Sequence, residues 1–270
     1  MKRVEAKLAR LRACVKALDS AAIAFSGGAD SSLVALIAKE QLGERAIAIT
    51  IDSPMFPASE LASARETARR IGIEHIVVKV DALKDTDMTA NRPDRCYLCK
   101  RAFMTEVRKT ADKHDITHVL DGSNVDDQKD YRPGTKAKDE LGVESPLANS
   151  KLTKSDIVAI SKILKLPTAD KRPSPCLASR IPYGEPITRE KLSMIEEAED
   201  FLRAKGLDEV RVRMHGMMAR IEVRPKDIER LTNPGNRISI VKKFKSLGFS
   251  YVSMDMEGYR MGSLNEVLNR

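Results

Sequence analysis

The sequence predicts an α/β protein built on a doubly wound parallel sheet, followed by a smaller C-terminal α/β domain. In the first part of the chain, short apolar runs alternate with segments whose apolar residues recur at helical spacing. Strands of nearly continuous apolar character are typical of a parallel sheet that is covered on both faces. Proline becomes frequent at residues 167–187, which indicates a connector loop. We therefore expect domains at 1–166 and 188–270, joined by this connector, which carries Cys176.

Length and composition limit the class of protein. The 270 residues can bury a full core, and a content of 32% charged and 42% hydrophobic residues is ordinary for a globular protein. The net charge of +8 and a pI near 9.3 favour an anionic partner, and a small nucleotide and tRNA satisfy this equally. No apolar run approaches the roughly 20 residues of a membrane span, and residues 1–5 begin an amphipathic helix rather than a signal peptide. We expect a cytoplasmic protein without membrane contact.

The elements of the first domain follow from the spacing of apolar residues. Leu8, Leu11 and Val15 recur at helical spacing and predict a helix over 2–17. The continuous apolar runs at 21–25 and 46–51 predict buried strands. The same criteria predict, in order, a helix ending near residue 41, a helix at 57–70, a strand at 75–80, a helix at 97–114, a strand at 117–120 and a helix at 154–164.

Capping residues and alternating strands organise the C-terminal domain. Thr188 precedes a helical pattern that Gly206 ends, much as Thr153 and Asp156 approach a capping arrangement earlier in the chain. Two segments that alternate apolar and charged side chains predict a hairpin around Gly216. One face of this hairpin collects five basic or potentially basic side chains and one carboxylate, so it is either solvated or phosphate-binding. The remaining predicted elements are strands at 209–215, 218–224 and 249–254 and a helix at 237–247.

A glycine-rich turn between the first strand and the next helix is the most informative motif. It reads Ser26-Gly27-Gly28-Ala29-Asp30-Ser31-Ser32. The glycines allow a tight turn and a close approach to an anion, and the free N–H groups and dipole of the following helix attract negative charge. No lysine follows the glycines, which distinguishes the motif from a Walker loop. The alternative is a simple turn whose Asp and Ser side chains cap a helix.

Two further loops are predicted to face the same crevice. Ligands of doubly wound sheets bind outside the carboxyl ends of the strands. Residues 50–53 and 121–124 follow the second and fourth predicted strands at that edge. Asp126 and Asp127 are weaker candidates for the site, because acids at such positions also cap turns. The sequence therefore predicts one phosphate-binding crevice built from three loops.

The cysteines predict a metal centre rather than disulfides in a reducing compartment. Cys96 and Cys99 lie one helical turn apart, so both sulfurs can reach one metal, and the basic residues beside them favour the thiolate form. Structural zinc needs four ligands, and only Cys176 is a natural third. Three thiolates would leave one iron of a 4Fe–4S cluster open to bind a substrate or an extra sulfide. Cys14 fits a small core residue.

Several segments together resemble the LarE family, the ATP-dependent sulfur transferases that build the nickel-pincer nucleotide cofactor of lactate racemase. These segments are residues 26–32, 91–100, 121–124 and 175–184, with the strand residues 211–213 and 219–222. The resemblance extends over nearly the whole chain, and its most specific part is 175–184. It implies the PP-loop ATP pyrophosphatase fold, which is of the adenine nucleotide alpha hydrolase-like type.

The resemblance implies a two-step reaction. ATP adenylates a carboxylate of pyridinium-3,5-biscarboxylic acid mononucleotide, and a sulfur nucleophile then displaces AMP to leave a thiocarboxylate. In one branch of the family the sulfur comes from the cysteine that matches Cys176, which becomes dehydroalanine. In another branch three cysteines bind a 4Fe–4S cluster that carries the transferable sulfide, and the presence of Cys96, Cys99 and Cys176 favours this branch. A sacrificial Cys176 beside a spectator cysteine pair is the alternative.

The same resemblance implies roles for individual residues. Asp30 is expected to hold Mg²⁺ and, with Cys176, to be catalytic. The expected ATP-binding residues are Ser26, Gly27, Gly28, Asp30, Ser31, Ser32, Asp52 and Gly122. The expected substrate-binding residues are Ser179, Arg180, Arg211, Arg213 and Glu222, and Glu199 and Glu222 are further candidates for a metal. A homo-oligomer is expected, because the family forms trimer-based hexamers, and other proteins of nickel-pincer biosynthesis are the expected partners.

Three other functions share part of this pattern. A PP-loop tRNA thiolase would also use the loop, the basic charge and the cysteines, but its RNA-binding module should carry stacking aromatic residues. Aromatic residues make up only 4% of this chain and tryptophan is absent, so nucleic acid is not the expected partner. An ATP-dependent amide synthase of the GMP or NAD synthetase type would leave the cysteines unexplained. A non-catalytic nucleotide-binding module would bind ATP without releasing pyrophosphate.

Overall fold

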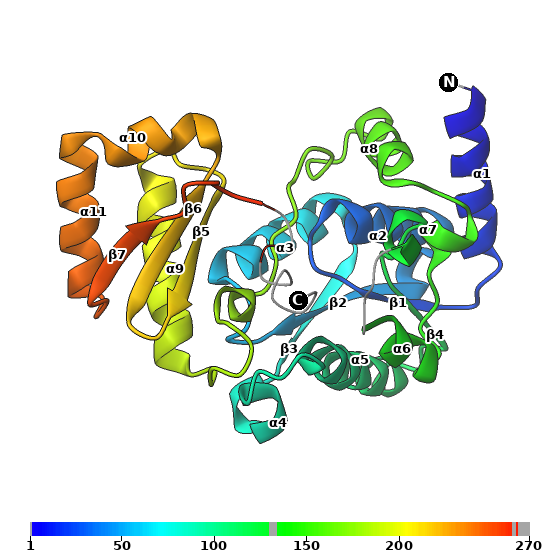
Figure 1. Ribbon diagram of the computed structural model, residues 1–270. Coiled ribbons are helices and arrows are strands. Elements are labelled where there is room, and N and C mark those ends of the chain that lie inside the picture. The colour runs from blue at the N-terminus through cyan, green and yellow to red at the C-terminus, as the bar shows by residue number, and fades with distance from the viewer. Residues whose placement is uncertain (1, 130–133, 261–262, 264–270) are drawn as a thin grey trace. The chain divides into compact units, whose positions relative to one another are not determined.

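The chain forms two compact units (Figure 1). The structure is a computed structural model and describes residues 2–129, 134–260 and 263. Within these, the first unit runs to Asp81 and resumes at 94–174, and the second unit contains 82–93 and everything from Pro175 onward. The second unit is therefore discontinuous in sequence, whereas the expected division at 166 and 188 is linear.

A four-stranded parallel sheet is the centre of the first unit. Its strands are β1 (Ala21–Ala24), β2 (Ala46–Asp52), β3 (Glu74–Lys79) and β4 (His118–Leu120). Their order is β3-β2-β1-β4, and Ala21 of β1 pairs with both Ala46 and His118. The helices of this unit are α1 (Lys2–Lys16), α2 (Ala29–Leu42), α3 (Ala58–Ile71), α5 (Arg95–Lys113), α6 (Gly134–Glu140), α7 (Pro146–Asn149) and α8 (Lys154–Ile163). The predicted fold class is confirmed.

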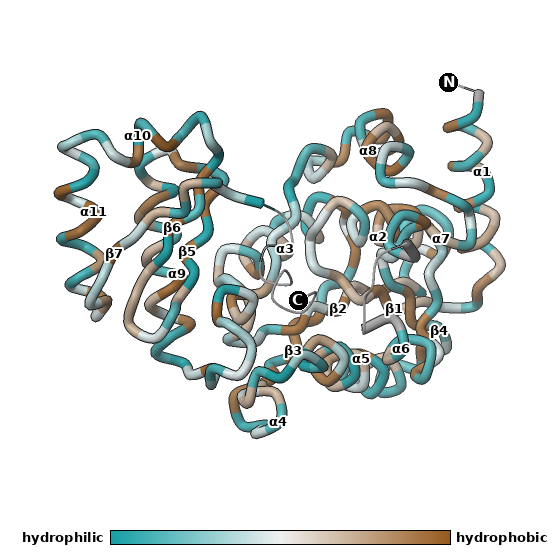
Figure 2. The backbone as a smooth tube through the Cα atoms, in the orientation of Figure 1, coloured by the Kyte–Doolittle hydropathy of each residue, from teal (hydrophilic) through white to brown (hydrophobic). Residues whose placement is uncertain are grey.

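Two separate hydrophobic cores show that this sheet is covered on both faces. Alternate strand residues point to opposite faces, and Ile23 packs in one core with Leu11 of α1 and Leu33 of α2. Ala22, the neighbouring residue, packs in the other core with α5. Figure 1 shows α5 on one side of the sheet and α2 on the other, and in Figure 2 the helices alternate between hydrophobic and hydrophilic stretches, as amphipathic helices do. The sheet is therefore doubly wound.

The second unit is a smaller α/β assembly. Its three-stranded sheet has the order β5-β6-β7, with β5 and β6 antiparallel and β6 and β7 parallel. The hairpin turns at Gly216, whose φ of 54° lies in the left-handed region. Thr188 accepts a hydrogen bond from the Lys191 amide and caps the first long helix. The elements are α4 (Thr86–Thr89), α9 (Arg189–Ala204), β5 (Val210–His215), β6 (Met218–Val223), α10 (Ile228–Thr232), α11 (Pro234–Ser246) and β7 (Tyr251–Met254).

Asn91 explains why residues 82–93 belong to the second unit. Its side chain is fully buried, and its Nδ2 lies 3.2, 2.7 and 3.1 Å from the carbonyl oxygens of Ile181, Pro182 and Glu185. Its own carbonyl accepts a hydrogen bond from the amide of Gly184. A buried amide group must find such partners, so this one side chain ties the inserted segment to the connector.

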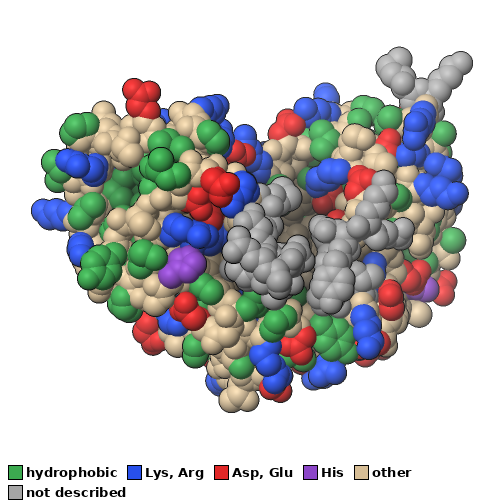
Figure 3. All heavy atoms as spheres, in the orientation of Figure 1, with side chains coloured by type: hydrophobic (Ala, Val, Ile, Leu, Met, Phe, Trp, Pro, Cys, Tyr) green, Lys and Arg blue, Asp and Glu red, His purple; other side chains and the backbone are tan. Residues whose placement is uncertain are grey.

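The described residues form a surface of mixed character and helices of moderate length and hydrophobicity. On the face drawn in Figure 3, charged and hydrophobic side chains are interspersed over both units. None of the described helices is long and apolar enough to cross a membrane.

Candidate functional site

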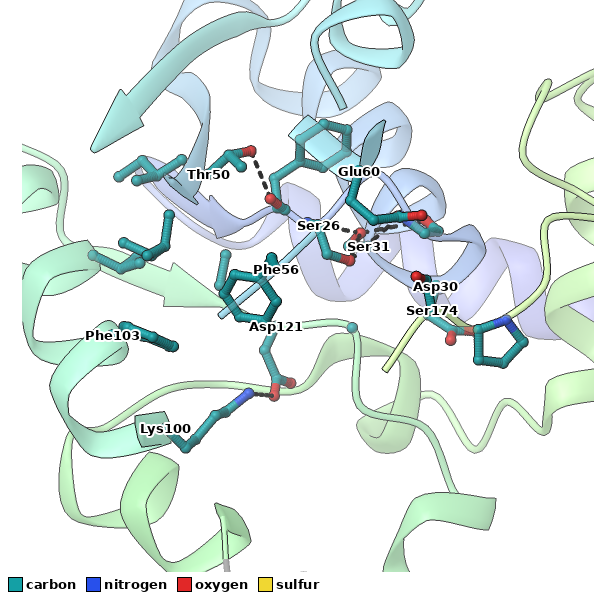
Figure 4. Close-up of a pocket in the computed structure, with 18 of the residues that line it drawn as sticks. Ser26, Asp30, Ser31, Thr50, Phe56, Glu60, Lys100, Phe103, Asp121 and Ser174 are labelled. Atoms are coloured by element: carbon teal, nitrogen blue, oxygen red, sulfur yellow. Dashed lines mark hydrogen bonds and ion pairs between the residues drawn. The ribbon is translucent and has the colours of Figure 1, made fainter. Parts of the chain in front are cut away.

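A pocket of about 660 Å³ lies in the first unit at the carboxyl ends of β1, β2 and β4. β1 is flanked by β2 on one side and β4 on the other, so the strand order reverses beside it. Doubly wound sheets bind ligands at such a reversal, and the volume is in the usual range for small-molecule sites. Figure 4 shows side chains from all three predicted loops around the pocket. The predicted crevice is therefore present as a cavity.

The glycine-rich turn is shaped by close packing. Gly27 has a φ of +66°, and a Cβ there would lie 2.7 Å from the Cα of Ala64 on α3. Gly28 occupies the N-cap position of α2, and no described side chain caps that helix end. The Oγ atoms of Ser26 and Ser31 lie 3.1 Å apart (Figure 4). The start of α2 thus presents backbone N–H groups and two hydroxyl groups, an arrangement that suits phosphate oxygens.

The third loop packs directly on this turn. A Cβ on Gly122 would lie 2.8 Å from the backbone nitrogen of Ser31, so only glycine allows this approach. The neighbouring Asp121 is buried and faces Lys100 of α5 at 3.6 Å (Figure 4). Burial raises the pKa of Asp121, but Lys100, Ser123 and further hydrogen bonds outweigh it and lower the pKa below its ordinary value. Asp121 is therefore ionised and holds Lys100 at the pocket.

Asp30 and Lys154 form an ion pair at the pocket. Lys154 Nζ lies 2.7 Å from each Oδ of Asp30, and both residues line the cavity. The backbone nitrogen of Lys154, at the start of α8, also donates to the Asp126 carboxylate at 2.8 Å. Lys154 was not among the residues predicted from the sequence. It reaches the glycine loop from 124 residues away in sequence.

Two of the predicted ATP-binding residues do not line the pocket. Gly27 turns the backbone and packs against Ala64, while Ser32 is fully buried. The Ser32 Oγ has no partner within the described part of the chain. The remaining six predicted ATP-binding residues all line the cavity: Ser26, Gly28, Asp30, Ser31, Asp52 and Gly122. An ATP-binding role for Gly27 and Ser32 stays a prediction.

The pocket combines an apolar wall with an excess of negative charge. The rings of Phe56 and Phe103 lie 5.6 Å apart at 49°, a tilted aromatic pair that offers flat apolar surface. Neither ring was singled out from the sequence. The charged residues that line the cavity are the six carboxylates of Asp30, Asp52, Glu60, Asp121, Asp126 and Asp127 and the two lysines Lys100 and Lys154. An anionic ligand would therefore need added cations in this site.

The first half of the connector is fastened to the glycine loop. Lys171 Nζ donates to the Gly27 carbonyl at 3.1 Å and to Ser63 Oγ at 2.8 Å, and it pairs with Glu60 at 2.8 Å. Ser174, three residues later, lines the pocket with Pro173 (Figure 4). The connector thus passes along the rim of the cavity in the first unit.

The predicted cluster ligands belong to two different units. Cys96 is exposed and Cys99 half-buried in the first turns of α5, while Cys176 begins a 3-10 turn at Leu177–Arg180 in the second unit. None of the three is part of a disulfide in the described part of the chain. Within residues 2–129, 134–260 and 263, no group of three or more His, Cys, Asp or Glu side chains is arranged to hold a metal. The i and i+3 spacing on α5 suits two ligands of one centre.

Arg180 fixes the backbone around Cys176. It is fully buried, and its Nη1 donates to the carbonyl oxygens of Pro175 at 2.7 Å and Cys176 at 2.8 Å. Its Nε and Nη2 form a two-pronged ion pair with Glu199 at 2.9 and 3.0 Å. Burial raises the pKa of Glu199, but Arg180 first and then two other arginines bring it below its ordinary value. In this arrangement Arg180 positions the cysteine rather than offering free donors to a substrate.

Two residues on the basic hairpin face of the second unit, Arg213 and Glu222, are buried. Arg213 binds both oxygens of Glu222 at 3.0 Å and donates to the Ser179 carbonyl at 2.6 Å. Because Glu199 and Glu222 are buried and accept from arginines through both oxygens, neither offers a free carboxylate to a metal. Strand alternation alone would leave Arg213 and Glu222 solvated, but the structure buries both.

Arg211 differs from the other arginines of this face. It lies over the ring of Tyr259, 5.2 Å from the centroid, and donates to the carbonyl of Val210. Burial, and then the nearby Arg180, lower the pKa of Arg211. A partly buried guanidinium whose pKa is lowered in this way gains from an anion beside it. Of the two arginines predicted to bind phosphate, Arg211 fits that role better.

Comparison with known proteins covers nearly the whole chain. A family model described as asparagine synthase matches residues 8–126. An uncharacterized protein of Synechocystis sp. is 43% identical over 99% of this chain and 100% of its own length. The pyridinium-3,5-bisthiocarboxylic acid mononucleotide synthase of Lactiplantibacillus plantarum is 35% identical over 98% of this chain and 95% of its own. An uncharacterized protein of Methanocaldococcus jannaschii is 35% identical over 88% of this chain and 90% of its own.

Proposed function

Because the chain belongs to the LarE family of ATP-dependent sulfur transferases, we propose that it converts pyridinium-3,5-biscarboxylic acid mononucleotide to the thiocarboxylate. In the first step a carboxylate oxygen attacks the α-phosphorus of ATP and pyrophosphate leaves. In the second, a sulfur nucleophile attacks the acyl carbon, and AMP leaves with the electrons of the carbon–oxygen bond. The product serves nickel-pincer cofactor synthesis.

The glycine loop at the strand reversal is the observation that carries this proposal. Gly28 opens α2 without a side-chain cap, and Ser26 and Ser31 turn their hydroxyl groups toward each other beside it. These groups suit the β- and γ-phosphates of ATP. The Phe56–Phe103 wall of the same cavity suits the flat adenine ring.

Magnesium fits the acidic side of the pocket. Mg²⁺ prefers carboxylate oxygens together with substrate phosphates, and Asp30 places both of its oxygens at the cavity. The other carboxylates of the lining would repel an unaccompanied polyphosphate. We assign Asp30 as the residue that holds the metal, which supplies charge neutralisation when bound.

Sulfur delivery is assigned to the connector. Cys176 follows Ser174 by two residues, and two residues of chain span at most about 7 Å, so covalent geometry keeps it near a residue of the pocket lining. Cys96, Cys99 and Cys176 would hold a 4Fe–4S cluster, which supplies an iron with an open position for a transferable sulfide. Arg180 holds the carbonyl of Cys176 in either case.

The second unit is assigned to the substrate. Arg211 would bind the phosphate of the mononucleotide, because it is partly buried, and burial and the nearby Arg180 lower its pKa. Arg213 and Glu222 would support the site rather than contact the substrate, since each is already bound to the other. A homo-oligomer and partners in the same biosynthesis stay predictions.

The test is anaerobic incubation with ATP and the biscarboxylate mononucleotide, followed by mass analysis of protein and product. Asp30→Ala should stop formation of AMP and pyrophosphate. Cys176→Ala should abolish sulfur transfer and largely spare pyrophosphate release, whereas equal loss of both would remove Cys176 from the sulfur step.

The sulfur source is read from the same samples. Brown protein with about four iron atoms per chain indicates the cluster. Colourless protein that loses about 34 Da at Cys176 indicates β-elimination to dehydroalanine, in which the Cβ–S bond breaks as the α-proton leaves. A wild-type protein that releases no pyrophosphate with any carboxylate of this class would contradict the proposed function.

A further inference from the structure

One lysine of the connector joins it to the glycine loop and to α3. Lys171 Nζ donates to the Gly27 carbonyl at 3.1 Å and to Ser63 Oγ at 2.8 Å, and it pairs with Glu60 at 2.8 Å. We propose that Lys171 is a positioning residue for sulfur transfer: it fastens the connector to the glycine loop and so keeps the segment that carries Cys176 near the adenylated carboxylate. This inference rests on the proposed function, because it takes the adenylate as the species that the sulfur attacks.

The contacts of Lys171 use its whole ammonium group. An ammonium group has three N–H donors, and three acceptors converge on this one. The first is a backbone carbonyl of the glycine loop, and the other two belong to α3, where Glu60 and Ser63 lie one helical turn apart. The side chains of Lys171 and Glu60 are only 20% and 25% exposed. Because its donors are already engaged, Lys171 acts through the segments that it holds rather than by binding a ligand.

Lys171 contacts the glycine turn from outside the cavity. Among the described residues, Glu60 lines the pocket, whereas Lys171 and Gly27 do not. Two residues after Lys171 the connector reaches the rim, where Pro173 and Ser174 line the cavity. The contact therefore holds the connector at the rim without filling the space that a nucleotide needs.

The connector depends on side-chain contacts for its course. Residues 171–176 belong to no helix or strand, and 172–175 are exposed. Five residues of chain, the separation of Lys171 and Cys176, span at most about 18 Å. The neighbouring Asp170 pairs with Lys162 of α8, but these side chains are 77% and 56% exposed, and such pairs contribute little. Lys171 is thus the more shielded of the two anchors at the start of this stretch.

Loss of the anchor should separate adenylation from sulfur transfer. The acyl adenylate has two competing fates. In one, sulfur attacks the acyl carbon and AMP leaves. In the other, a water oxygen attacks the same carbon, AMP leaves, a proton passes to solvent and the carboxylate is restored. A connector that is displaced by about 1 Å can react about 100-fold more slowly, so the adenylate would accumulate or be lost to water.

The experiment compares Lys171→Met with Lys162→Met, which breaks the exposed ion pair of the neighbouring connector residue. Thiocarboxylate and pyrophosphate are measured in the first turnover of the same anaerobic reaction. ATP is saturating, because an unpaired Glu60 carboxylate at the pocket would weaken ATP binding in K171M. The ratio of thiocarboxylate to pyrophosphate should fall by about 10- to 100-fold in K171M, while pyrophosphate release continues. K162M should match the wild type.

Ser63→Ala is a milder second variant that decides the matter if K171M does not fold. It removes one acceptor of Lys171 and keeps the ion pair with Glu60, so the ratio should fall by about 2- to 10-fold. An unchanged ratio in the folded variants would overturn the role of Lys171. An equal loss of thiocarboxylate and pyrophosphate in K171M would also overturn it, because adenylation itself would then have failed.

Hydrogen exchange separates this inference from the proposed function, because it needs no substrate. Exchange of the glycine loop, residues 26–32, and of the connector, residues 167–187, is followed by mass spectrometry. Both segments should exchange faster in K171M and at the wild-type rate in K162M. A wild-type protein that releases no pyrophosphate would contradict the proposed reaction. The anchor would still stand if exchange rose in K171M alone, and it would be wrong if K171M exchanged like the wild type.

Discussion

Ion pairs occur in both units of the molecule but differ in burial and in the number of partners. In the first unit, Asp30 and Lys154 are both partly exposed and contact each other at the rim of a cavity. In the second unit, Arg180 and Glu199 are fully excluded from solvent. Arg180 also binds two backbone carbonyl groups, and Glu199 accepts from the Val212 amide at 3.1 Å.

This difference indicates two uses of charge. A partly exposed pair can trade partners when a ligand arrives, because water screens both charges throughout. A buried pair cannot, because removal of one partner leaves the other charge without water. The Asp30–Lys154 pair can therefore exchange partners with a ligand, while Arg180 and Glu199 fix the backbone that carries Cys176.

Removal of single partners tests this comparison most strongly. Arg180→Met should lower the free energy of unfolding by about 3–5 kcal/mol, because Glu199 would be left charged and buried. Lys154→Met should lower it by less than about 1 kcal/mol. Urea unfolding followed by circular dichroism measures both. Hydrogen exchange at the Val212 amide, which Glu199 caps, should rise only in the Arg180 variant.

A double replacement provides the control for that measurement. Arg180→Met with Glu199→Met removes both buried charges and should be less destabilising than R180M alone. If R180M and K154M lowered stability equally, the distinction between fixed and exchangeable pairs would be wrong.

The backbone of the glycine loop should tolerate substitution less well than the Asp30–Lys154 ion pair beside it. Gly27→Ala and Gly72→Ala both place a side chain at positive φ, +66° and +73°, at a cost of about 1–2 kcal/mol. Only at Gly27 would the new Cβ meet a neighbour, the Cα of Ala64 at 2.7 Å. G27A should lose a further 1–3 kcal/mol or so and most pyrophosphate release, whereas G72A keeps its activity. Equal activity in the two variants would show that the turn can shift freely.

Acid should weaken the ion pair between Lys7 and Asp156 that anchors the start of α8. Burial raises the pKa of Asp156, but Lys7 and Thr153 outweigh it and lower the value from 3.8 to about 2. A carboxyl group whose pKa is lowered by folding stabilises the fold above about pH 4, and this contribution is lost as the pH falls toward 2. Asp156→Asn should therefore be less stable than the wild type at pH 7 and show a smaller further loss between pH 4 and 2. Asp170→Asn, which is exposed, is the matched control in the same pH titration by urea unfolding.

Local patterns were sufficient to predict the fold and the core of the candidate site. Continuous apolar runs indicate buried strands, and the glycine loop is one contiguous motif between a strand and a helix. The cap of α8 at Thr153 and Asp156 was likewise visible, because a capping box spans only four residues.

Contacts between distant residues were not predictable in this way. Lys154 meets Asp30 across 124 residues, and Asn91 meets Pro182 across 91. Strand alternation predicts that Arg213 and Glu222 share one face of the hairpin. It does not predict that the connector contacts Arg213 through the carbonyl of Ser179. One signal for Lys154 was present: a lysine in the first turn of a helix opposes the dipole and so calls for a compensating partner elsewhere.

The discontinuous second unit has a consequence for how such a protein can evolve. The chain passes from one unit to the other three times, after residues 81, 93 and 174. Recombination at a single point could not donate or remove the second unit as an intact module, because Asn91 would be left behind without the carbonyl oxygens of Ile181, Pro182 and Glu185. We therefore expect the two units to be inherited together, and their sequences to share one ancestry.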